Sequence, residues 1–198
     1  MTDDRTPTPP FTVLHVCGGN TCRSAMAERL FAARVDARGA TTSVYSHSCG
    51  VDHRQVGSAM NPPAAAQVAA RGGDSFGFRA RHLAREHVEA SDLILAATGD
   101  QVAYIVDAYP DAAERTFQLN HFGLIAAAIA PDELPTDVAG ERRIMARGMA
   151  LVTLADGRRA DHDGVDVADP WGADDATFGR IASSIDESLG MVVARLLG

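Results

Sequence analysis

The sequence predicts an α/β fold in three layers, with a four-stranded parallel sheet and helices on both of its faces. Short apolar segments with strand character alternate along the chain with segments of helical periodicity. This alternation indicates a parallel sheet, because parallel neighbours are joined by crossovers that are usually helical. A length of 198 residues suits one hydrophobic core. We therefore expect a single domain over residues 11–198.

The local pattern places the individual elements. Strands are expected at 12–17, 42–48, 92–97 and 115–119, and helices at 23–38, 62–71, 100–108 and 174–197. Asn61 can cap the second of these helices, Pro62 suits its first turn, and Gly72 and Gly73 end it. The last helix carries an apolar stripe of the kind that faces a core, formed by Ile181, Ile185, Leu189, Val192, Val193 and Leu196.

Composition excludes several classes of protein. The net charge of −8 and the lack of any basic run argue against a nucleic-acid partner. No segment approaches the ~20 apolar residues of a membrane span. Residues 1–10 are polar and hold three prolines, so we expect a disordered tail and no signal peptide. Three cysteines do not suggest a disulfide framework, which favours a reducing, cytoplasmic location.

The most informative segment is V-L-H-V-C-G-G-N-T-C-R-S at residues 13–24. An apolar strand leads into Cys17, glycines occupy the turn, and Arg23 begins a helix. This order is what a phosphate-binding loop with a built-in nucleophile requires. Backbone N–H groups of residues 18–23 can surround an oxyanion, and the helix N-terminus favours the Cys17 thiolate. Arg23 can hold two phosphate oxygens at once.

The other loop residues are expected to bind substrate or to shape the loop. They are Gly18, Gly19, Asn20, Thr21, Cys22 and Ser24. Ser24 can donate a hydrogen bond to the sulfur of Cys17. Asn20 can brace the loop by side-chain hydrogen bonds to the backbone, or can be a turn residue that tolerates a positive φ, and both roles can hold together.

This segment resembles the phosphate loop of the low-molecular-weight protein tyrosine phosphatase family. The family pattern V-C-x-G-N-x-C-R-S-x-M-A-E is matched at every fixed position from Val16 to Glu28. Similarity extends to residues 48–50, to 78–81 and to the sequence D-P-W-G at 169–172. Phe78 stands where the family usually has His, so a reduced polar network is expected there.

The resemblance implies hydrolysis of phosphate monoesters through a phosphocysteine. Cys17 would then be the nucleophile, Arg23 would bind the phosphate, and Asp169 would act first as general acid and then as general base. Trp171 would wall the pocket, or would instead cover the core as an aromatic plug. The aspartates that compete with Asp169 for the acid role are Asp166, Asp174 and Asp175.

Several alternatives stay open at this stage. Cys22 is either a reversible disulfide partner of Cys17 or a small residue at the start of a helix. By the same resemblance His53, with Asp52 and Arg54, borders the substrate mouth, where it touches substrate or is plain surface. The seven histidines show no metal-ligand spacing, so no metal and no other cofactor is expected.

The choice of substrate depends on Thr21. Most tyrosine phosphatases of the family have an apolar residue at this position, whereas bacterial protein-arginine phosphatases of the family resemble this chain. The leading hypothesis is a phosphotyrosine phosphatase, with phosphoarginine second. A thiol-dependent arsenate reductase is less favoured, because residues 97–119 hold no cysteine. The expected partner is a phosphorylated protein, a bacterial tyrosine kinase being one candidate.

Residues 122–163 are unlike the family, which usually crosses to the Asp-Pro loop in fewer residues. Helical segments are expected at 123–130 and 138–154, separated by Pro131 and Pro135. We expect this insertion to pack beside the mouth of the active site, with core packing favoured over a partner-binding surface.

Overall fold

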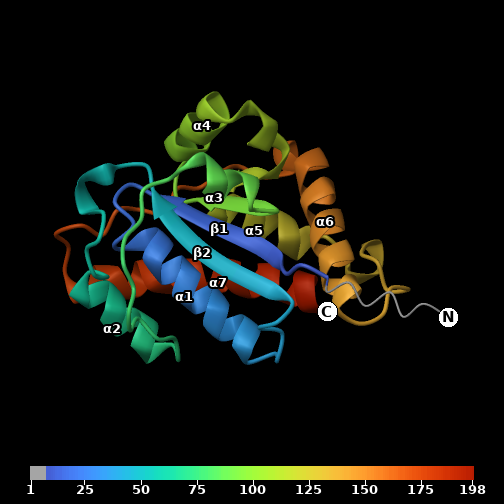
Figure 1. Cartoon of the computed structure of the whole chain (residues 1–198), viewed down its shortest axis with the longest axis horizontal. Coiled ribbons are helices and arrows are strands. Elements are labelled where there is room, and N and C mark those ends of the chain that lie inside the picture. The colour runs from blue at the N-terminus through green and yellow to red at the C-terminus, as the bar shows by residue number, and fades with distance from the viewer. Residues whose placement is uncertain (1–7) are drawn as a thin grey trace.

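A four-stranded parallel sheet forms the centre of the molecule (Figure 1). The computed structural model describes residues 8–198, so most of the expected tail, residues 1–7, lies outside the described residues. The strands are β1 (Phe11–Cys17), β2 (Val44–Gly50), β3 (Leu93–Ala96) and β4 (Thr116–Gln118), in the order β2-β1-β3-β4. The predicted α/β fold with four parallel strands is confirmed. Because β1 lies between β2 and β3, the loop after it opens where the strand order reverses.

Helices cover both faces of the sheet and complete the three layers. They are α1 (Arg23–Asp36), α2 (Pro62–Ala70), α3 (Arg85–Glu89), α4 (Gly99–Ala108), α5 (Leu119–Ala128), α6 (Glu141–Gly157) and α7 (Asp175–Leu197). Val13 of β1 packs in the larger core, with α1, α5 and α7. Leu14 and Val16 face the smaller core, with α3 and α4. This alternation along β1 is the period-2 pattern of a strand buried on both faces.

The second helix begins where expected, but its cap differs. Asn61 occupies the N-cap of α2, and its side chain makes no capping hydrogen bond. Its backbone N–H instead donates to the carbonyl oxygen of Thr21 at 2.9 Å. The capping role expected for the Asn61 side chain is therefore wrong, and the residue ties α2 to the loop that follows β1.

The two helices of the insertion are present, with shifted ends. α5 begins at Leu119, directly after the three-residue strand β4, and α6 runs from Glu141 to Gly157. Gly123 lies inside α5 and does not begin it. A Cβ atom there would lie 2.8 Å from Cβ of Ser188, so the glycine lets α5 and α7 pack closely.

The expected position of this insertion beside the active-site mouth is wrong for α6. Gly148 of α6 lies against the Phe11 ring, which an added Cβ would approach to 2.4 Å. Phe11 begins β1, at the opposite end from Cys17, and Figure 1 shows α6 beside the C-terminus of the chain. Arg147 donates to the carbonyl oxygen of Arg195 near the end of α7 at 2.8 Å. Leu151 and Ala155 are buried, so α6 extends the core at the strand starts.

Two buried histidines sit within the sheet. His15 of β1 is fully buried beside the Phe31 ring, and its Nε2 lies 3.2 Å from Oγ of Ser46. Burial lowers the pKa of His15 to about 3. Burial, and then the charge of Arg81, lowers the pKa of His47 to about 4. Both rings are therefore neutral in the folded protein near pH 7.

We predict that the fold loses stability as the pH falls from 7 to 5. The unfolded chain protonates each histidine near its ordinary pKa of about 6.5, whereas the folded chain does not, so acid favours unfolding by about 2 kcal/mol per residue at pH 5. Urea unfolding at both pH values measures this. His15→Asn should show a smaller loss between pH 7 and pH 5 than the wild type, whatever its stability at pH 7. The exposed control His53→Asn should keep the wild-type loss, and an unchanged loss in His15→Asn would contradict the assignment.

Candidate active site

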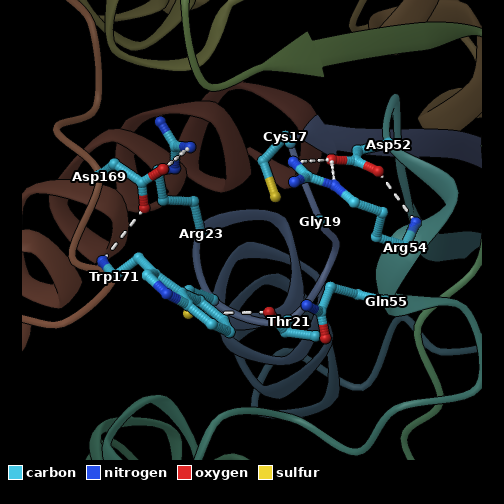
Figure 2. A pocket seen from close by; sticks show the side chains of 11 residues that line it. Cys17, Gly19, Thr21, Arg23, Asp52, Arg54, Gln55, Asp169 and Trp171 are labelled. Atoms are coloured by element: carbon cyan, nitrogen blue, oxygen red, sulfur yellow. Dashed lines mark hydrogen bonds and ion pairs between the residues drawn. The ribbon is translucent and has the colours of Figure 1, made fainter.

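A pocket of about 370 Å³ opens at the C-terminal end of β1, around Cys17 (Figure 2). It is lined by Cys17, Gly18, Gly19, Thr21, Cys22, Arg23, Asp52, Arg54, Gln55, Asp169 and Trp171. Three segments that lie far apart in the sequence, residues 17–23, 52–55 and 169–171, therefore meet here. Figure 2 shows Asp169 and Trp171 on one side of Cys17, and Asp52, Arg54 and Gln55 on the other.

The loop after β1 is held by the side-chain amide of Asn20. Asn20 has a φ of 55°, in the left-handed region that an asparagine tolerates. Its Oδ1 accepts a hydrogen bond from the backbone N–H of Arg81 at 2.8 Å. Its Nδ2 donates to Oγ of Ser24 at 2.9 Å and to Oγ of Ser48 at 2.8 Å. Both roles considered for Asn20 are therefore present, although the amide donates to side chains and only its oxygen meets backbone.

These contacts orient the hydroxyl group beside Cys17. Oγ of Ser24 lies 3.0 Å from Sγ of Cys17 and 3.3 Å from the carbonyl oxygen of Cys49. The amide of Asn20 donates to the Ser24 oxygen, which leaves the single hydroxyl proton of Ser24 for one of these two acceptors. A thiolate is acceptor only and carries charge, so it would take this proton in preference to the carbonyl.

Arg23 lies under the pocket and contacts the Asp169 loop. Its side chain is 9% exposed, and its Nη2 lies 2.7 Å from Oδ2 of Asp169. Its Nη1 donates to the carbonyl oxygen of Val167 at 3.1 Å. Asp169 itself is 57% exposed, and its Oδ1 accepts from the backbone N–H of Trp171 at 3.2 Å. The carboxylate is therefore held at the rim, where it can also reach a bound molecule.

The neighbouring aspartates have other partners. Asp166 Oδ1 accepts from the backbone N–H of Gly99 at 2.8 Å and from Nε2 of Gln118 at 2.6 Å. Asp174 caps α7 by accepting from the backbone N–H of Thr177 at 2.9 Å. Asp175 lies in the first turn of that helix. Asp166 thus tethers the loop to the start of α4 and to β4, and Asp169 is left facing Cys17 across the pocket.

The opposite wall comes from the segment after β2. Asp52 and Arg54 form an ion pair, with Nε of Arg54 2.6 Å from Oδ2 of Asp52. The hydrogen bonds from Arg54 lower the pKa of Asp52 to about 2. Asp52 and Arg54 line the pocket, whereas His53 is not among the lining residues. Gln55 was missed by the sequence reasoning: it packs over Gly19, where an added Cβ would lie 3.1 Å from its Cγ.

The structure decides whether Trp171 is a wall of the pocket or a plug over the core. Trp171 is 61% exposed at the rim of the pocket, so it is not a plug over the core.

Cys22 lines the pocket, and burial raises the pKa of its thiol to about 11. Oγ1 of Thr21 lies 3.9 Å from the Cys22 sulfur. All three cysteines are free thiols in the structure, so a disulfide between Cys17 and Cys22 stays a prediction.

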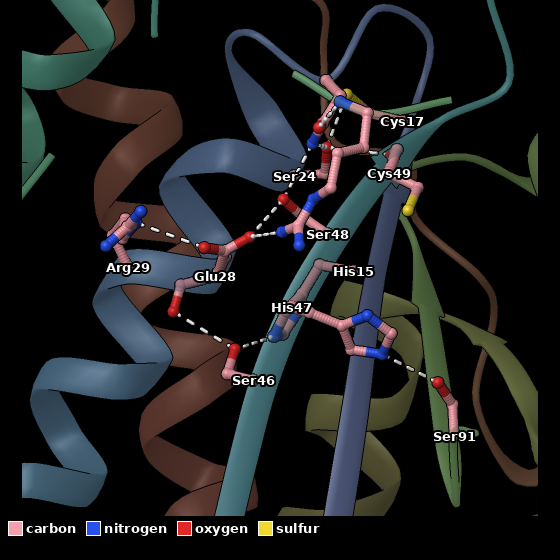
Figure 3. A network of polar contacts seen from close by, with 12 residues as sticks. His15, Cys17, Ser24, Glu28, Arg29, Ser46, His47, Ser48, Cys49 and Ser91 are labelled. Carbon is pink, nitrogen blue, oxygen red and sulfur yellow. Dashed lines mark hydrogen bonds and ion pairs between the residues drawn. The ribbon is translucent and has the colours of Figure 1, made fainter. Parts of the chain in front are cut away.

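A polar network behind the loop was not assigned from the sequence (Figure 3). Glu28 accepts a hydrogen bond from Oγ of Ser48 at 2.6 Å and pairs with Nη2 of Arg81 at 2.9 Å. Ser48 in turn accepts from Asn20, so Glu28 supports the loop after β1 indirectly, through Ser48 and Asn20. The signal was available, because Glu28, Ser48 and Arg81 all stand in the segments that resemble the family.

Among the side chains that the structure describes, at residues 8–140 and 142–198, no three of His, Cys, Asp or Glu gather in a way that could hold a metal ion. Within the same described residues, no helix combines the length and the apolar character needed to cross a bilayer.

The family model described as low molecular weight phosphotyrosine protein phosphatase matches residues 12–132, more than half of the chain. This match ends before Asp169 and includes the loop from Cys17 to Arg23.

Curated relatives of two kinds are similar to parts of the chain. The low molecular weight protein-tyrosine phosphatase A of Mycobacterium tuberculosis is 39% identical over 87 residues, 44% of this chain and 52% of that protein. A protein-arginine-phosphatase of Geobacillus stearothermophilus is 32% identical over 113 residues, 57% of this chain and 72% of that protein. The chain thus spans about half the length of the tyrosine phosphatase that it matches.

Solved structures extend the similarity of fold to almost the whole chain. The low molecular weight protein tyrosine phosphatase from T. tengcongensis superposes with a TM-score of 0.67 at 24% identity. The superposition covers 93% of this chain and 98% of that one. At this identity the likeness concerns the fold alone.

We predict that Gly50→Ala disturbs the loop. A Cβ atom at Gly50 would lie 2.5 Å from the carbonyl oxygen of Gly18 and 3.0 Å from the backbone nitrogen of Asn20. Overpacking of this kind costs about 1–3 kcal/mol, and here the strain falls on the backbone of the loop after β1. Thermal unfolding and titration with inorganic phosphate should show lower stability and weaker binding. The control Gly157→Ala, which meets nothing within 4 Å, should leave both unchanged. Wild-type phosphate binding in Gly50→Ala would contradict the prediction.

Proposed function

Because the chain belongs to the low molecular weight phosphotyrosine protein phosphatase family, we propose that it hydrolyses phosphotyrosine in proteins through a phosphocysteine intermediate. The observation that carries the proposal is one pocket shared by the Cys17 thiol, the Arg23 guanidinium and the Asp169 carboxyl group. These are the nucleophile, the oxyanion-binding group and the proton donor that cleavage of a phosphate monoester requires.

The first step transfers the phosphoryl group to sulfur. The Cys17 thiolate attacks phosphorus in line with the ester oxygen, and the bond from phosphorus to that oxygen breaks. Backbone N–H groups of the loop and the Arg23 guanidinium stabilise the equatorial oxygens. Asp169, in its protonated form, gives its proton to the leaving tyrosyl oxygen.

The second step frees the enzyme. The Asp169 carboxylate takes a proton from a water molecule, which attacks phosphorus and breaks the sulfur–phosphorus bond. Inorganic phosphate leaves and the Cys17 thiolate is regenerated, with the Ser24 hydroxyl 3.0 Å away as its hydrogen-bond donor. Since Arg23 pairs with Asp169 at 2.7 Å, bound phosphate competes with that carboxylate for the guanidinium.

The rim of the pocket favours an aromatic ester. Trp171 presents a largely exposed indole ring beside the pocket, on which the phenyl ring of phosphotyrosine can stack. The charges of Asp52 and Arg54 on the other wall are paired with each other, so they do not demand a charged substrate group. The physiological partner that we propose is a phosphorylated protein, with a tyrosine kinase as one candidate.

Phosphoarginine is the second candidate substrate, and Thr21 favours it. Thr21 lines the pocket, with its Oγ1 3.9 Å from the sulfur of Cys22, and its hydroxyl reduces the apolar surface that a phenyl ring would use. The similarity to a protein-arginine-phosphatase over 113 residues supports the same alternative.

Substitution of the proposed nucleophile and acid tests the mechanism. We predict that Cys17→Ser abolishes turnover of p-nitrophenyl phosphate, because the alcohol is a far weaker nucleophile than the thiolate. Asp169→Asn should lower kcat by ~10²–10⁴-fold, the usual contribution of a general acid. It should bind inorganic phosphate at least as tightly as the wild type, because Arg23 loses its competing partner. Asp174→Asn, a control in the same segment, should keep kcat within about twofold of wild type. Turnover by Cys17→Ser at the wild-type rate would reject the mechanism.

Substitution of Thr21 tests the choice of substrate. We predict that Thr21→Ile raises kcat/KM for phosphotyrosine relative to phosphoarginine by about tenfold, since an apolar side chain is worth ~1–3 kcal/mol in a pocket. Steady-state kinetics on both substrates, with exposed Thr42→Ile as control, provides the ratio. Wild-type preference for phosphoarginine would make the second candidate the function, and an unchanged ratio would remove Thr21 from the argument.

A further inference from the structure

A second hollow, of about 410 Å³, lies behind the catalytic loop, between α1, β2 and the segment around residues 77–81. Its lining residues are Glu28, Arg29, Ala32, Tyr45, Ser46, Gly77, Phe78, Arg79 and Arg81. It shares no lining residue with the pocket around Cys17, and it is of similar size. We call it the arginine groove.

Three arginines and one glutamate give the arginine groove a positive charge. The chain as a whole carries a net charge of −8, so a local excess of cations runs against its composition. Guanidinium groups that line a concave surface together are the usual means of holding a phosphate group. The charge and the shape of the groove therefore match the same kind of ligand.

Glu28 does not neutralise this excess. Its Oε2 already accepts from Oγ of Ser48 at 2.6 Å and from Nη2 of Arg81 at 2.9 Å, and its Oε1 lies 3.2 Å from Nε of Arg29. Figure 3 shows Glu28 between Arg29 and Ser48, on the side toward the catalytic loop. The carboxylate thus holds Nε of Arg29 and Nη2 of Arg81 on the side toward Ser48. Arg79 has no acidic partner among the described residues.

The Phe78 ring supports one of the arginines of the arginine groove. The guanidinium of Arg29 lies over the Phe78 ring, 5.5 Å from its centroid, and Phe78 itself is buried. Tyr45 on β2 is 52% exposed. Phe78 occupies the position where the family usually has His, so the ring that supports Arg29 is a feature of this chain. A pre-positioned cation loses less side-chain entropy when an anion binds.

A purely structural role accounts for only part of this cluster. Arg81 has a structural task, because it holds Glu28 and its backbone N–H binds Asn20. Arg79 is exposed and donates from Nη1 to the carbonyl oxygen of its own neighbour Phe78 at 2.7 Å. Because that hydrogen bond joins two adjacent residues, it does not connect separate parts of the fold. The position of Arg79 at the groove therefore suits a role in binding a ligand.

We propose that the arginine groove is a second oxyanion site, which binds a small ligand carrying phosphate groups independently of the pocket at Cys17. Arg29, Arg79 and Arg81 bind its phosphate oxygens. Two phosphate groups suit a groove of this size and charge better than one, so pyrophosphate is the probe of choice.

Calorimetric titration with pyrophosphate tests this on the full-length protein. The wild type should bind two equivalents, one in each site. Arg23→Ala disables the pocket at Cys17 and should bind one equivalent. Arg79→Ala should also bind one equivalent, with unchanged hydrolysis of p-nitrophenyl phosphate. Arg180→Ala, on α7, is the matched control and should bind as the wild type does. Because Arg79 is exposed, its substitution is not expected to unfold the protein, so the comparison with wild type stands even if Arg23→Ala misfolds.

Three results would overturn the proposal. One is a single equivalent of pyrophosphate in the wild type, and another is two equivalents in Arg79→Ala. The third is citrate binding at the arginine groove as tightly as pyrophosphate, which would deny the groove any preference for phosphate. The proposal would be supported if Arg23→Ala still binds one equivalent of pyrophosphate and the double variant Arg23→Ala, Arg79→Ala binds none.

Discussion

The side-chain amide of Asn20 is the interaction on which the site depends. A loop that turns its N–H groups toward an anion leaves few of them for bonds of its own, so its shape must be held from outside. Asn20 does this with hydrogen bonds to Arg81, Ser24 and Ser48, and it accepts a φ of 55° to do so. Because the same amide donates to the oxygen of Ser24, the hydroxyl proton of Ser24 is available to the sulfur of Cys17. A buried amide with each contact satisfied is stiff, and stiffness is what preorganised anion binding requires.

The parallel sheet supplies the second constraint. Because β1 lies between β2 and β3, the end of β2 runs beside the loop, and Val51 and Asp52 donate to the carbonyl oxygens of Cys17 and Gly18 at 3.0 Å each. Gly50 allows this close approach. The sheet thus builds one wall of the pocket, and the return of the chain at Val167, whose N–H bonds the Ala97 carbonyl oxygen at 2.8 Å, builds the other.

Carboxylates pair with arginines on both sides of the loop after β1. In front, Asp169 pairs with Arg23, and in the proposed mechanism the phosphate ester would displace this carboxylate from the guanidinium. Behind, Glu28 joins Arg29 and Arg81 to Ser48 and so to Asn20. The arginine groove and the loop after β1 therefore share one support, although the two pockets have no lining residue in common.

The sequence by itself determined the architecture and the centre of the site. Alternating periodicities fixed the order of strands and helices, and the run from Cys17 to Ser24 is local, so its chemistry can be read from spacing. Contacts between distant segments were decided only by the tertiary structure. Nothing local to Asp166 and Asp169 says which carboxylate tethers the loop and which faces Cys17, because that depends on where Gly99 and Gln118 lie. The helical insertion showed the same limit. A helix was expected over residues 138–154, but a helix that can cover either end of a sheet is placed by its partners, here Phe11 and the end of α7.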